Sequence, residues 1–537
     1  MLDNNSADRP AVQRPWLVLG ILCTGFFMSL LDATIVNIAV PTLIHGIGAS
    51  YDQVLWVIDA YLLVFSALLI TTGRLGDTFG YRRLFLIGVS AFTAASALCG
   101  LASTPGQLLG ARVLQGLGAA LLFPQVISSI LTIFPPRMRG RAFGVFGAIA
   151  GLAPVLGPVF GGFIVDHLGW RWIFYINVPI GVATAVLALV FVPALRVARP
   201  HQIDLVGVVL ATAGLSGIVF GLIEGERYDW GTISGPIGIP SVIAAGVVLL
   251  ALFVGWQHVQ RGEPLMPLGL CAGRNFAVGN WIGFVFQLGM IGIAFVLVLD
   301  LQMAQGYSPL EAGFVLLPNA VLTAIGSAYA GRLADRIGGK RVLAAGMIML
   351  ALGLVVIVAM AGPDTGAWSL LPGLLIIGIA SGATFAPLQQ VTMDGVDPGL
   401  AGAASGVAGT TRQVGGVLGT AVVGAVLAAY LNSALRDEAE LRAAQLPVGL
   451  RAQFVESAVS GGGKFSPPPV PAGLSPEDAA LFARLGHETF AVGFVNAMQV
   501  VLLASAAVLV VAALFCFALK GSDHATRGEE SRAAAEG

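Results

Sequence analysis

The sequence predicts an all-α polytopic membrane protein, and three observations support that prediction. Of its 537 residues, 56% are hydrophobic and only 11% are charged, whereas about a quarter of the residues in an ordinary soluble domain are charged. Many apolar stretches reach the roughly 20 residues that a helix needs to cross a bilayer. These stretches lack the strict alternation of barrel strands, and a helix satisfies its own backbone hydrogen bonds in lipid. A soluble enzyme, a nucleic-acid-binding protein and a disordered chain are therefore excluded.

Fourteen apolar stretches are long enough to be transmembrane helices. We expect these spans at residues 16–40, 54–73, 84–102, 107–133, 141–165, 172–193, 205–223, 237–257, 276–299, 312–330, 342–361, 369–392, 402–430 and 490–518. Most of the eight tryptophans lie at or near their ends, where an amphipathic ring prefers to sit. The pattern therefore indicates fourteen transmembrane helices in a plasma membrane.

The basic residues of the short loops predict that both termini are cytoplasmic. Cytoplasmic loops carry an excess of Lys and Arg, and this orientation gives that face 19 of the 28 basic residues. They are Arg9, Arg14, Arg74, Arg82, Arg83, Arg137, Arg139, Arg141, Arg196, Arg199, Arg261, Arg274, Arg332, Arg336, Lys340, Arg341, Lys520, Arg527 and Arg532. The short loops of the opposite face hold only Arg171 and Arg227.

The remaining composition bears on partners and compartment. The 28 basic and 29 acidic residues nearly cancel, so no bulk charge indicates an anionic partner. The four cysteines all lie in apolar stretches, which predicts neither a disulfide framework nor a zinc site. Residues 1–15 are polar and lack a small-residue cleavage site. We therefore expect a cytoplasmic tail there and no signal peptide.

A short sequence after the second span recurs after the tenth. GRLGDTFGYRR at residues 73–83 and GRLADRIGGKR at residues 331–341 match at six of eleven positions. The glycines permit a tight turn, and the aspartate can pair with an arginine or cap a neighbouring helix, which holds one conformation. A basic turn that only sets topology would explain a single copy equally well. Two copies in register favour a conformational gate, for which the candidate residues are Gly73, Arg74, Asp77, Gly80, Arg83 and Asp335.

The repeat divides the chain into halves and predicts a 6 + 2 + 6 arrangement of spans. Repeated halves with a path between them are typical of transporters. The expected domains are a cytoplasmic tail at 1–15, an N-terminal six-helix bundle at 16–200, a two-helix insertion at 201–262, a C-terminal six-helix bundle at 263–519 and a cytoplasmic tail at 520–537.

Residues 431–489 are the one sizeable polar segment, and the topology places this loop outside the cytoplasm between the last two helices. A charged, alanine-rich helical stretch begins it and runs to about Leu446. Residues 461–463 are glycines and 467–469 prolines, the composition of a flexible or extended linker. We expect a short helix near 475–487, capped at Ser475. No motif assigns this segment a role.

Five motifs in order resemble the major facilitator superfamily, and more closely its fourteen-helix drug:proton antiporter family. The repeated loop is similar to the superfamily signature between helices 2 and 3. The other four resemble that family's motifs in helix 1, helix 4, helix 5 and the connection from helix 5 to helix 6: LDATIVNIAVP at 31–41, RVLQGLGAA at 112–120, GLAPVLGPVFGG at 151–162 and WRWIFYINVP at 170–179. The likeness covers nearly the whole chain, and the two extra spans match the insertion expected between the halves.

The resemblance implies a multidrug efflux antiporter driven by the proton motive force. It implies that acids at the positions of Asp32 and Asp59 serve protonation and recognition of cationic drugs. It implies that Arg112 acts as their counter-charge in coupling. The helix 5 motif that it associates with antiport comprises Pro154, Gly157, Pro158, Gly161 and Gly162.

The intramembrane charges are also candidates on physical grounds. A charge in hydrocarbon costs at least about 2.5 kcal/mol on insertion scales, so an ionisable residue within a span is a functional candidate. Of the 29 acids only Asp32 and Asp59 fall well inside spans. Their depths on antiparallel helices would allow them to form a pair that holds a proton near neutral pH. Two alternatives stay open: Asp32 fixed for packing by hydroxyls or by Arg112, and Asp59 facing lipid headgroups.

Arg112 cannot deprotonate and needs an acceptor, so it is either a coupling counter-charge or a structural donor to backbone carbonyls. Arg412 is a weaker candidate because residues 410–413 lie closer to a predicted span end. The glycines and prolines of helix 5 permit close packing and bending, which would serve equally in a static bundle.

We therefore expect a secondary transporter and not an enzyme. The chain has no Gly-x4-Gly-Lys-Ser/Thr phosphate loop, so it is not expected to hydrolyse ATP. No cofactor, metal or nucleic acid is expected as a partner. The expected partners are protons, the lipid bilayer and drug-like molecules, whose export would confer antibiotic resistance. The alternative is an exporter or importer of a specific metabolite, sugar or lipid on the same fold. A receptor or enzyme is disfavoured because the loops lack catalytic clusters.

Overall fold

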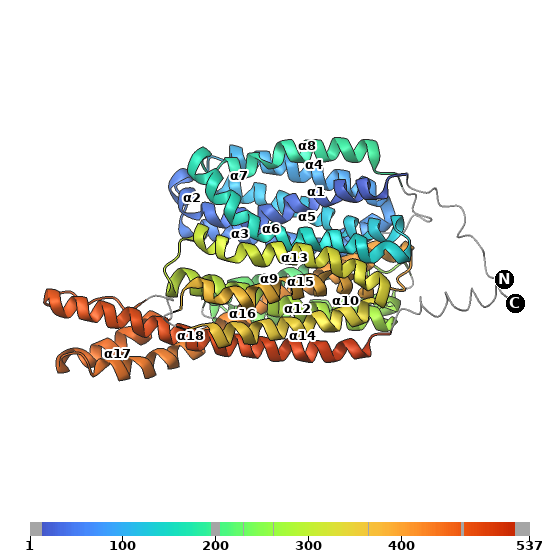
Figure 1. Cartoon of the computed structure of the whole chain (residues 1–537). Helices are drawn as coiled ribbons and strands as arrows, with labels where there is room; N and C mark the ends of the chain where they lie inside the picture. Colours follow the sequence, from blue (N-terminus) through green and yellow to red (C-terminus); the bar gives the residue numbers. More distant parts are fainter. Residues whose placement is uncertain are drawn as a thin grey trace, which may run out of the picture.

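The computed structural model describes residues 13–194, 204–228, 230–260, 262–362, 365–462 and 467–520, and these ranges are almost entirely α-helical (Figure 1). Fourteen of their helical segments are long and apolar enough to cross a membrane. Each coincides with a stretch expected from hydropathy, so the prediction of a fourteen-span helical protein is confirmed. Most of the two predicted tails, Arg196, Arg199, Arg261 and the end of the glycine run lie outside the described residues.

The first six spans are formed by α1 to α8. In the first span, α1 (Pro15–Ile35) is followed by the 3-10 turn η1 (Val36–Ala39) and by α2 (Val40–Ile47). Regular α-helical geometry is therefore interrupted one turn beyond Asp32, a feature often found at functional positions. The other elements are α3 (Tyr51–Phe79), α4 (Tyr81–Leu101), α5 (Pro105–Ile133), η2 (Pro136–Met138), α6 (Arg139–Leu168), α7 (Trp172–Tyr175) and α8 (Asn177–Phe191).

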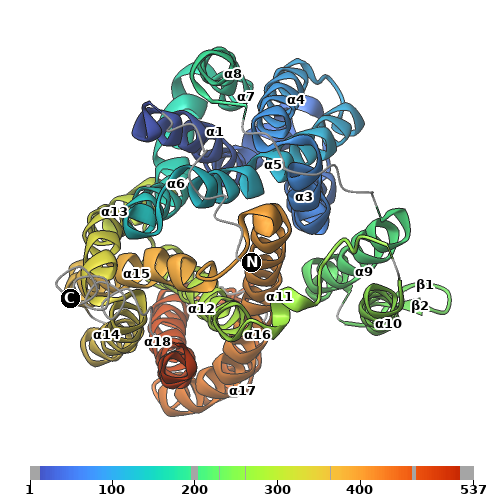
Figure 2. The ribbon, with the colours of Figure 1, turned by 90° about the vertical axis from the view of Figure 1, so that its right-hand side faces the viewer.

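The next two spans, α9 (Leu205–Glu224) and α10 (Ile239–Val259), pack against each other. They are joined by η3 (Glu226–Tyr228) and by a small antiparallel pair, β1 (Thr232–Ser234) and β2 (Ile237–Gly238). α9 also contacts α3 and α16. Figure 2 shows this helix pair set to one side of the other twelve spans.

Asp204, which lies just before α9, fastens the two helices of this pair together. Its carboxylate accepts hydrogen bonds from the backbone of Gly207 at 2.8 Å and from the side chains of Trp256 at 2.9 Å, Gln257 at 2.7 Å and Gln260 at 3.0 Å. Burial opposes ionisation of this carboxyl group, but the hydrogen bonds outweigh it and hold its pKa below the usual value.

The remaining six spans begin after α10. Their elements are α11 (Gly269–Ala272), α12 (Arg274–Leu299), the π-helical η4 (Asp300–Ala304), α13 (Pro309–Ile337), α14 (Gly339–Met360), η5 (Ala367–Leu370), α15 (Leu371–Thr392), η6 (Pro398–Leu400), α16 (Ala401–Ala443), α17 (Val448–Gly462), α18 (Pro476–Phe515) and η7 (Cys516–Ala518). Ser50 forms a capping box with Gln53 at the start of α3, and Ser308 forms one with Glu311 at the start of α13. These two helices are the second spans of their halves.

Two groups of helices face each other along the length of the molecule. We call α1–α8 the N-half and α11–α18 the C-half; Figure 2 shows the first group above and the second below. The halves meet where α6 packs along α13 and α3 packs along α16. α1 begins and α18 ends at the same end of the bundle, on the right in Figure 1, and we call it the terminal end. It remains a prediction that this end faces the cytoplasm, and the domain boundaries given above also remain predictions.

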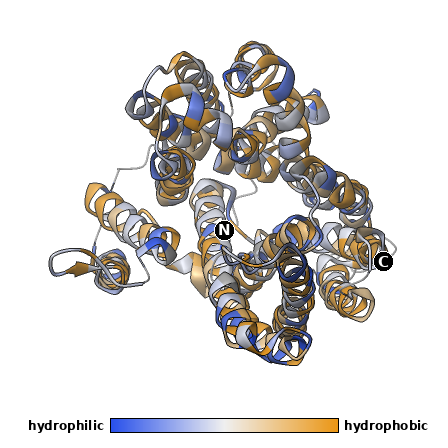
Figure 3. Cartoon of the chain, turned by 90° about the vertical axis from the view of Figure 1, so that its left-hand side faces the viewer, coloured by the Kyte–Doolittle hydropathy of each residue, from blue (hydrophilic) through white to orange (hydrophobic). Residues whose placement is uncertain are grey.

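The outer surface of the bundle is apolar. Large hydrophobic side chains are exposed on many helices; Leu205 is 71% and Val259 74% exposed. Figure 3, which colours the ribbon by hydropathy, shows hydrophobic residues in helices all around the bundle. Such a surface is unfavourable in water and suits contact with lipid tails. The chain is therefore described as a multi-pass protein of the plasma membrane.

In the segment 431–489 the helix start capped at Ser475 is confirmed, but this helix is not the separate short one that the sequence predicts. α16 continues to Ala443, and α18 runs unbroken from Pro476 into the last span, so α16, α17 and α18 project together beyond the bundle (Figure 1). The rings of Phe454 and Phe482 meet edge to face at 5.0 Å in a small apolar core. This core packs the extensions of the helices against each other, and α18 continues through it into the last span without a break.

Candidate functional site

The centre of the candidate site is the carboxylate of Asp32 on α1, which is fully buried. Arg112 of α5 forms an ion pair with it through Nη1. Gln115 of α5 donates from Nε2 to Oδ1 at 2.8 Å, and Asn177 of α8 donates from Nδ2 to the same oxygen at 3.0 Å. A buried carboxylate is thus held by donors from two other helices of the N-half.

Arg112 is held from several sides. Its Nε donates to the carbonyl oxygen of Val57 on α3 at 3.1 Å, and its Nη1 also donates to Oε1 of Gln115 at 2.8 Å. The guanidinium carbon lies 4.3 Å from the ring centroid of Tyr61, whose hydroxyl donates to the carbonyl of Ser29 at 2.9 Å. Among the described residues its Nη2 has no hydrogen-bond partner. Arg112 therefore connects three helices. The sequence predicts either a carboxylate or a backbone carbonyl as its partner, and the structure has both contacts.

Gln115 and Asn177 are site residues that the sequence analysis did not name as such, although both lie within its quoted motifs. Gln115 follows Arg112 by three residues and therefore shares its helix face. Asn177 also donates to the hydroxyl of Ser96 at 3.1 Å, which in turn donates to the carbonyl of Phe174 at 2.9 Å. The signal for both was an amide side chain inside an apolar span.

The structure places Asp59 in a different cluster from Asp32. The charged groups around it are Glu224 of α9 and Arg227 of η3. Arg227 pairs with Glu224 at 3.2 Å and with Asp52 at 2.9 Å. The expected pairing of Asp32 with Asp59 is therefore wrong, because the side chain of Asp59 lies at the contact between α3 and α9.

Two aspartates of the repeated loop reach across from one half to the other. Asp77, at the end of α3, accepts hydrogen bonds from the backbone N–H groups of Gly402 at 2.6 Å and Ala403 at 2.8 Å at the start of α16. Asp335, at the end of α13, accepts them from Gly140 at 2.8 Å and Arg141 at 3.0 Å at the start of α6. Each carboxylate caps a helix N-terminus of the opposite half, a favourable place for negative charge.

Glycines allow this close approach and the turns that follow it. A Cβ added to Gly73 would collide with the carbonyl oxygen of Gly402, and one added to Gly331 would collide with that of Gly140. Gly80 and Gly338, which end α3 and α13, both have φ of 91°, a conformation that L side chains rarely adopt. The sequence repeat is therefore also a repeat of backbone geometry.

The two arginines of the first loop have different surroundings. Arg74 is buried and lies 3.8 Å from Asp77 and 3.7 Å from Glu263, which follows α10. Arg83 is exposed on α4. Of the two, only Arg74 lies at the contact between the halves. Its contact with Glu263 could not be predicted from the sequence, because the two residues are far apart along the chain.

The helix 5 motif lies on α6. Gly157 and Gly161 face α1, because a Cβ at either position would press on Thr34 or Ile35. Gly162 faces α13 instead, where a Cβ would lie 3.9 Å from Leu310. Pro154 and Pro158 lie within the helix. The motif thus brings α6 close to the part of α1 that follows Asp32.

Aromatic rings cross the contact between the halves near mid-bundle. The ring of Phe146 on α6 stacks on Phe26 at 4.6 Å, and it lies 6.2 Å from both Phe123 of the N-half and Phe385 of the C-half. The guanidinium of Arg412 on α16 lies 5.5 Å from the ring centroids of both Phe123 and Phe385. Arg412 is only 7% exposed, so it is buried even though it lies nearer the start of α16 than its end.

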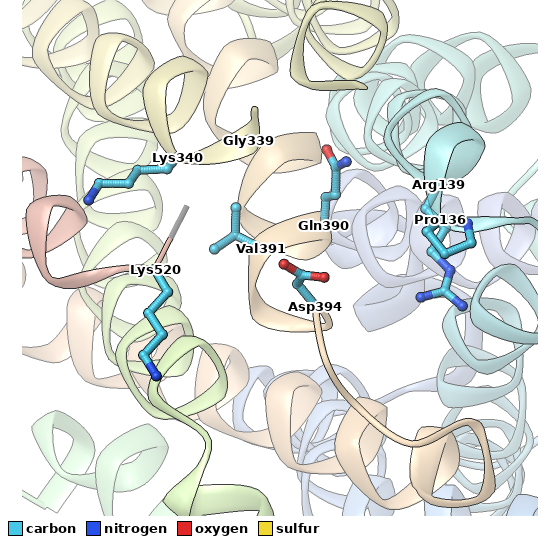
Figure 4. Close-up of a pocket in the computed structure, with 8 residues that line it drawn as sticks. All are labelled: Pro136, Arg139, Gly339, Lys340, Gln390, Val391, Asp394 and Lys520. Carbon is cyan, nitrogen blue, oxygen red and sulfur yellow. The ribbon is translucent and has the colours of Figure 1, made fainter. Parts of the chain in front are cut away.

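A cleft opens at the terminal end, between the halves and away from Asp32. Figure 4 shows its lining, which is Pro136 and Arg139 from the N-half and Gly339, Lys340, Gln390, Val391, Asp394 and Lys520 from the C-half. Gln390 donates to Asp335 at 3.2 Å. The cleft therefore borders the Asp335 cap.

Comparison with known proteins agrees with this architecture. A family profile described as Major Facilitator Superfamily matches residues 22–420. A probable actinorhodin transporter of Streptomyces coelicolor is 35% identical over 80% of this chain and 75% of its own length. The tetracenomycin C resistance and export protein of Streptomyces glaucescens is 34% identical over 96% of this chain and 94% of its own.

A solved structure has the same fold. The crystal structure of the human organic anion transporter MFSD10 superimposes with a TM-score of 0.58 at 13% identity, covering 95% of this chain and all of that one. At this identity the likeness concerns the fold alone.

Proposed function

The chain belongs to the major facilitator superfamily, and from that premise we propose that it exports drug-like, amphipathic small molecules in exchange for protons by alternating access. Its family and its relatives identify it as a transporter and not an enzyme, with relatives that export antibiotics. The proton coupling, the direction and the residues that carry them are the subject of the proposal.

The observation that supports proton coupling best is the environment of Asp32. A fully buried carboxylate is expensive unless paired, and here Arg112, Gln115 and Asn177 all donate to it. Protonation would remove the charge that these three donors share and release Arg112 from its ion pair. Because the donors lie on α5 and α8, gain or loss of one proton changes the attachment of α1 to its neighbours.

Alternating access is supported by the contacts that hold the halves together at the terminal end. Asp77 and Asp335 each tie one half to a helix start of the other. Breaking these caps would let the halves part at this end, which the charge bias predicts to be cytoplasmic. We propose that Gly73, Arg74, Asp77, Gly80, Arg83 and Asp335 form this gate, and that the α6 motif from Pro154 to Gly162 lets α6 move against α1.

The proton gradient would supply enough free energy for export. One proton moving inward down about 100 mV and one pH unit releases about 3.7 kcal/mol, which supports a roughly 500-fold concentration ratio of a neutral substrate. One titrating carboxylate is therefore sufficient. We assign this role to Asp32 with Arg112, and we assign Asp59 to the contact between α3 and α9.

The experiment is transport into proteoliposomes that carry the purified full chain. An imposed pH gradient should drive uptake of rhodamine 6G by the wild type, and Asp32→Asn should abolish the gradient-dependent part. Asp437→Asn, at an exposed position on α16, is the matched control and should transport normally. Gradient-driven transport that survives Asp32→Asn would refute the proposal. Transport of one metabolite with no dye or antibiotic carried would favour the alternative of a specific metabolite carrier.

A further inference from the structure

Arg412 is a buried cation that has no carboxylate partner among the residues that the structure describes. It lies about three turns into α16 and is 7% exposed. Its Nη1 is buried and donates to no acceptor within the described ranges. A buried charge is normally paired or hydrogen-bonded because desolvation is costly. The position therefore lacks an anion.

What surrounds the guanidinium is aromatic. Its central carbon lies 5.5 Å from the ring centroid of Phe123 on α5 and 5.5 Å from that of Phe385 on α15. Ring faces attract a cation but compensate its charge only in part. They accept no strong hydrogen bond, so the donors of Arg412 stay available to an acceptor that arrives from outside.

The location is one that a substrate would reach. Phe123 belongs to the N-half, whereas Arg412 and Phe385 belong to the C-half, so the guanidinium lies at the contact between the halves. Phe146 and Phe286 extend the aromatic cluster on either side of Phe385, at 6.2 Å and 6.3 Å. If the halves move apart during transport, these rings become walls on which a flat ring system can stack.

A second unsatisfied donor lies on α15, one helical turn after Phe385. Gln389 follows Phe385 by four residues, so both occupy one face of that helix. It is buried, and its Nε2 has no hydrogen-bond partner among the described residues. These two buried donor groups without acceptors lie on α15 and α16, which both pack against α12. They favour a ligand that brings acceptor oxygens.

We propose that Arg412, with Gln389, receives the negatively charged group of an aromatic substrate, such as a carboxylate, phenolate or enolate carried on a fused ring system. This inference rests on the proposed function and deepens it by naming a substrate class. It differs from the cation recognition that the family resemblance implies for Asp32, because the carboxylate of Asp32 is already occupied by Arg112, Gln115 and Asn177.

The test is equilibrium binding of two dyes that share a xanthene ring system but differ in charge: anionic fluorescein and cationic rhodamine 6G. Binding to the purified full chain is measured by fluorescence anisotropy without any proton gradient. Arg412→Gln should weaken fluorescein binding about tenfold or more, the scale expected for losing a hydrogen bond to a charged group, and leave rhodamine 6G unchanged. Arg436→Gln, an exposed position on the same helix, should change neither.

The outcomes separate this inference from the proposed function. Wild-type protein that binds rhodamine 6G but not fluorescein, or equal loss of both dyes in Arg412→Gln, would overturn the anion site even if gradient-driven transport is intact. Selective loss of fluorescein would support the site even if Asp32→Asn leaves transport coupled to protons. Should Arg412→Gln fail to fold, Gln389→Leu tests the same site and should also weaken fluorescein alone.

Discussion

Two of the buried arginines, Arg112 and Arg412, solve the same electrostatic problem differently. Arg112 in the N-half pairs with Asp32, donates to two further oxygens and lies over Tyr61. Arg412 in the C-half has two phenyl rings and, within the described ranges, no carboxylate. On the function proposed above, this difference means that the halves divide the work. The N-half holds an ion pair that a proton would break, and the C-half leaves a positive charge for a ligand.

The largest expected effect comes from breaking the satisfied pair. Arg112→Met leaves the Asp32 carboxylate buried and unpaired, which should cost about 3–5 kcal/mol of stability. Thermal unfolding of the purified protein in detergent measures the loss. The double variant Asp32→Asn/Arg112→Met should recover most of it, because no buried charge then remains. A double variant as unstable as Arg112→Met alone would contradict the pairing.

A smaller effect is expected at the gate, where backbone N–H groups of the opposite half donate to both carboxylates. The arginines lie farther away, with Arg74 at 3.8 Å from Asp77 and Arg141 at 3.9 Å from Asp335. Asp77→Asn weakens two charge-assisted hydrogen bonds to the start of α16, an effect of about 1.5–3 kcal/mol on closure. Ser405 is buried at this contact, 3.0 Å from Ser128. A cysteine probe made by Ser405→Cys, in a background with Cys271→Ser, should therefore react faster with maleimide in Asp77→Asn than in the parent.

Asp335→Asn is the symmetric partner of this experiment, and it should raise the labelling rate to a similar extent. Asp437→Asn is the control and should leave the rate unchanged. Equal labelling in the parent and both gate variants would show that the two caps do not hold the halves together.

Replacing Arg412 should affect stability far less than replacing Arg112. Arg412→Met removes an unpaired buried charge and gives up two cation–π contacts, so stability should change by less than about 1 kcal/mol or should rise. The same unfolding assay applies. A loss as large as that of Arg112→Met would mean that Arg412 has a structural counter-charge, and the contrast between the two halves would be lost.

A modest effect that depends on pH is expected at Asp204, a satisfied carboxylate outside the spans. Its hydrogen bonds lower its folded-state pKa, so its stabilisation is present above the unfolded value of about 3.9 and is lost as the pH falls through the folded value. Asp204→Ala should cost about 1 kcal/mol near pH 7 and progressively less in acid. Hydrogen exchange at the start of α9 measures this, and a loss that grows on acidification would contradict the assignment.

The sequence was sufficient for the spans because each depends only on local hydropathy. The same holds for the turns at Gly80 and Gly338, where a repeated motif fixes repeated geometry. It was insufficient for α18, whose continuity depends on packing of Phe482 against Phe454, a contact between segments that hydropathy treats separately.

Partners within the site were harder to predict for the same reason. Asp32 and Arg112 were each identified as buried charges, but depth alone also suggested Asp59 as a partner of Asp32. Only the rotation of α3 about its axis decides that Asp59 faces Glu224 instead. Arg412 was undervalued because its distance from the predicted span end does not show its burial. That burial comes from packing against Phe123 and Phe385, which lie on other helices.

Proton exchange at Asp32 is tested most directly by titrating this carboxyl group with infrared difference spectroscopy on the purified full chain. We predict a protonated-carboxyl band that appears on acidification within the pH range in which transport operates. This band should be absent in Asp32→Asn and present in Asp437→Asn. A spectrum in which no carboxyl band is lost with Asp32→Asn would mean that this carboxylate stays ionised, and the proposed proton exchange would be contradicted.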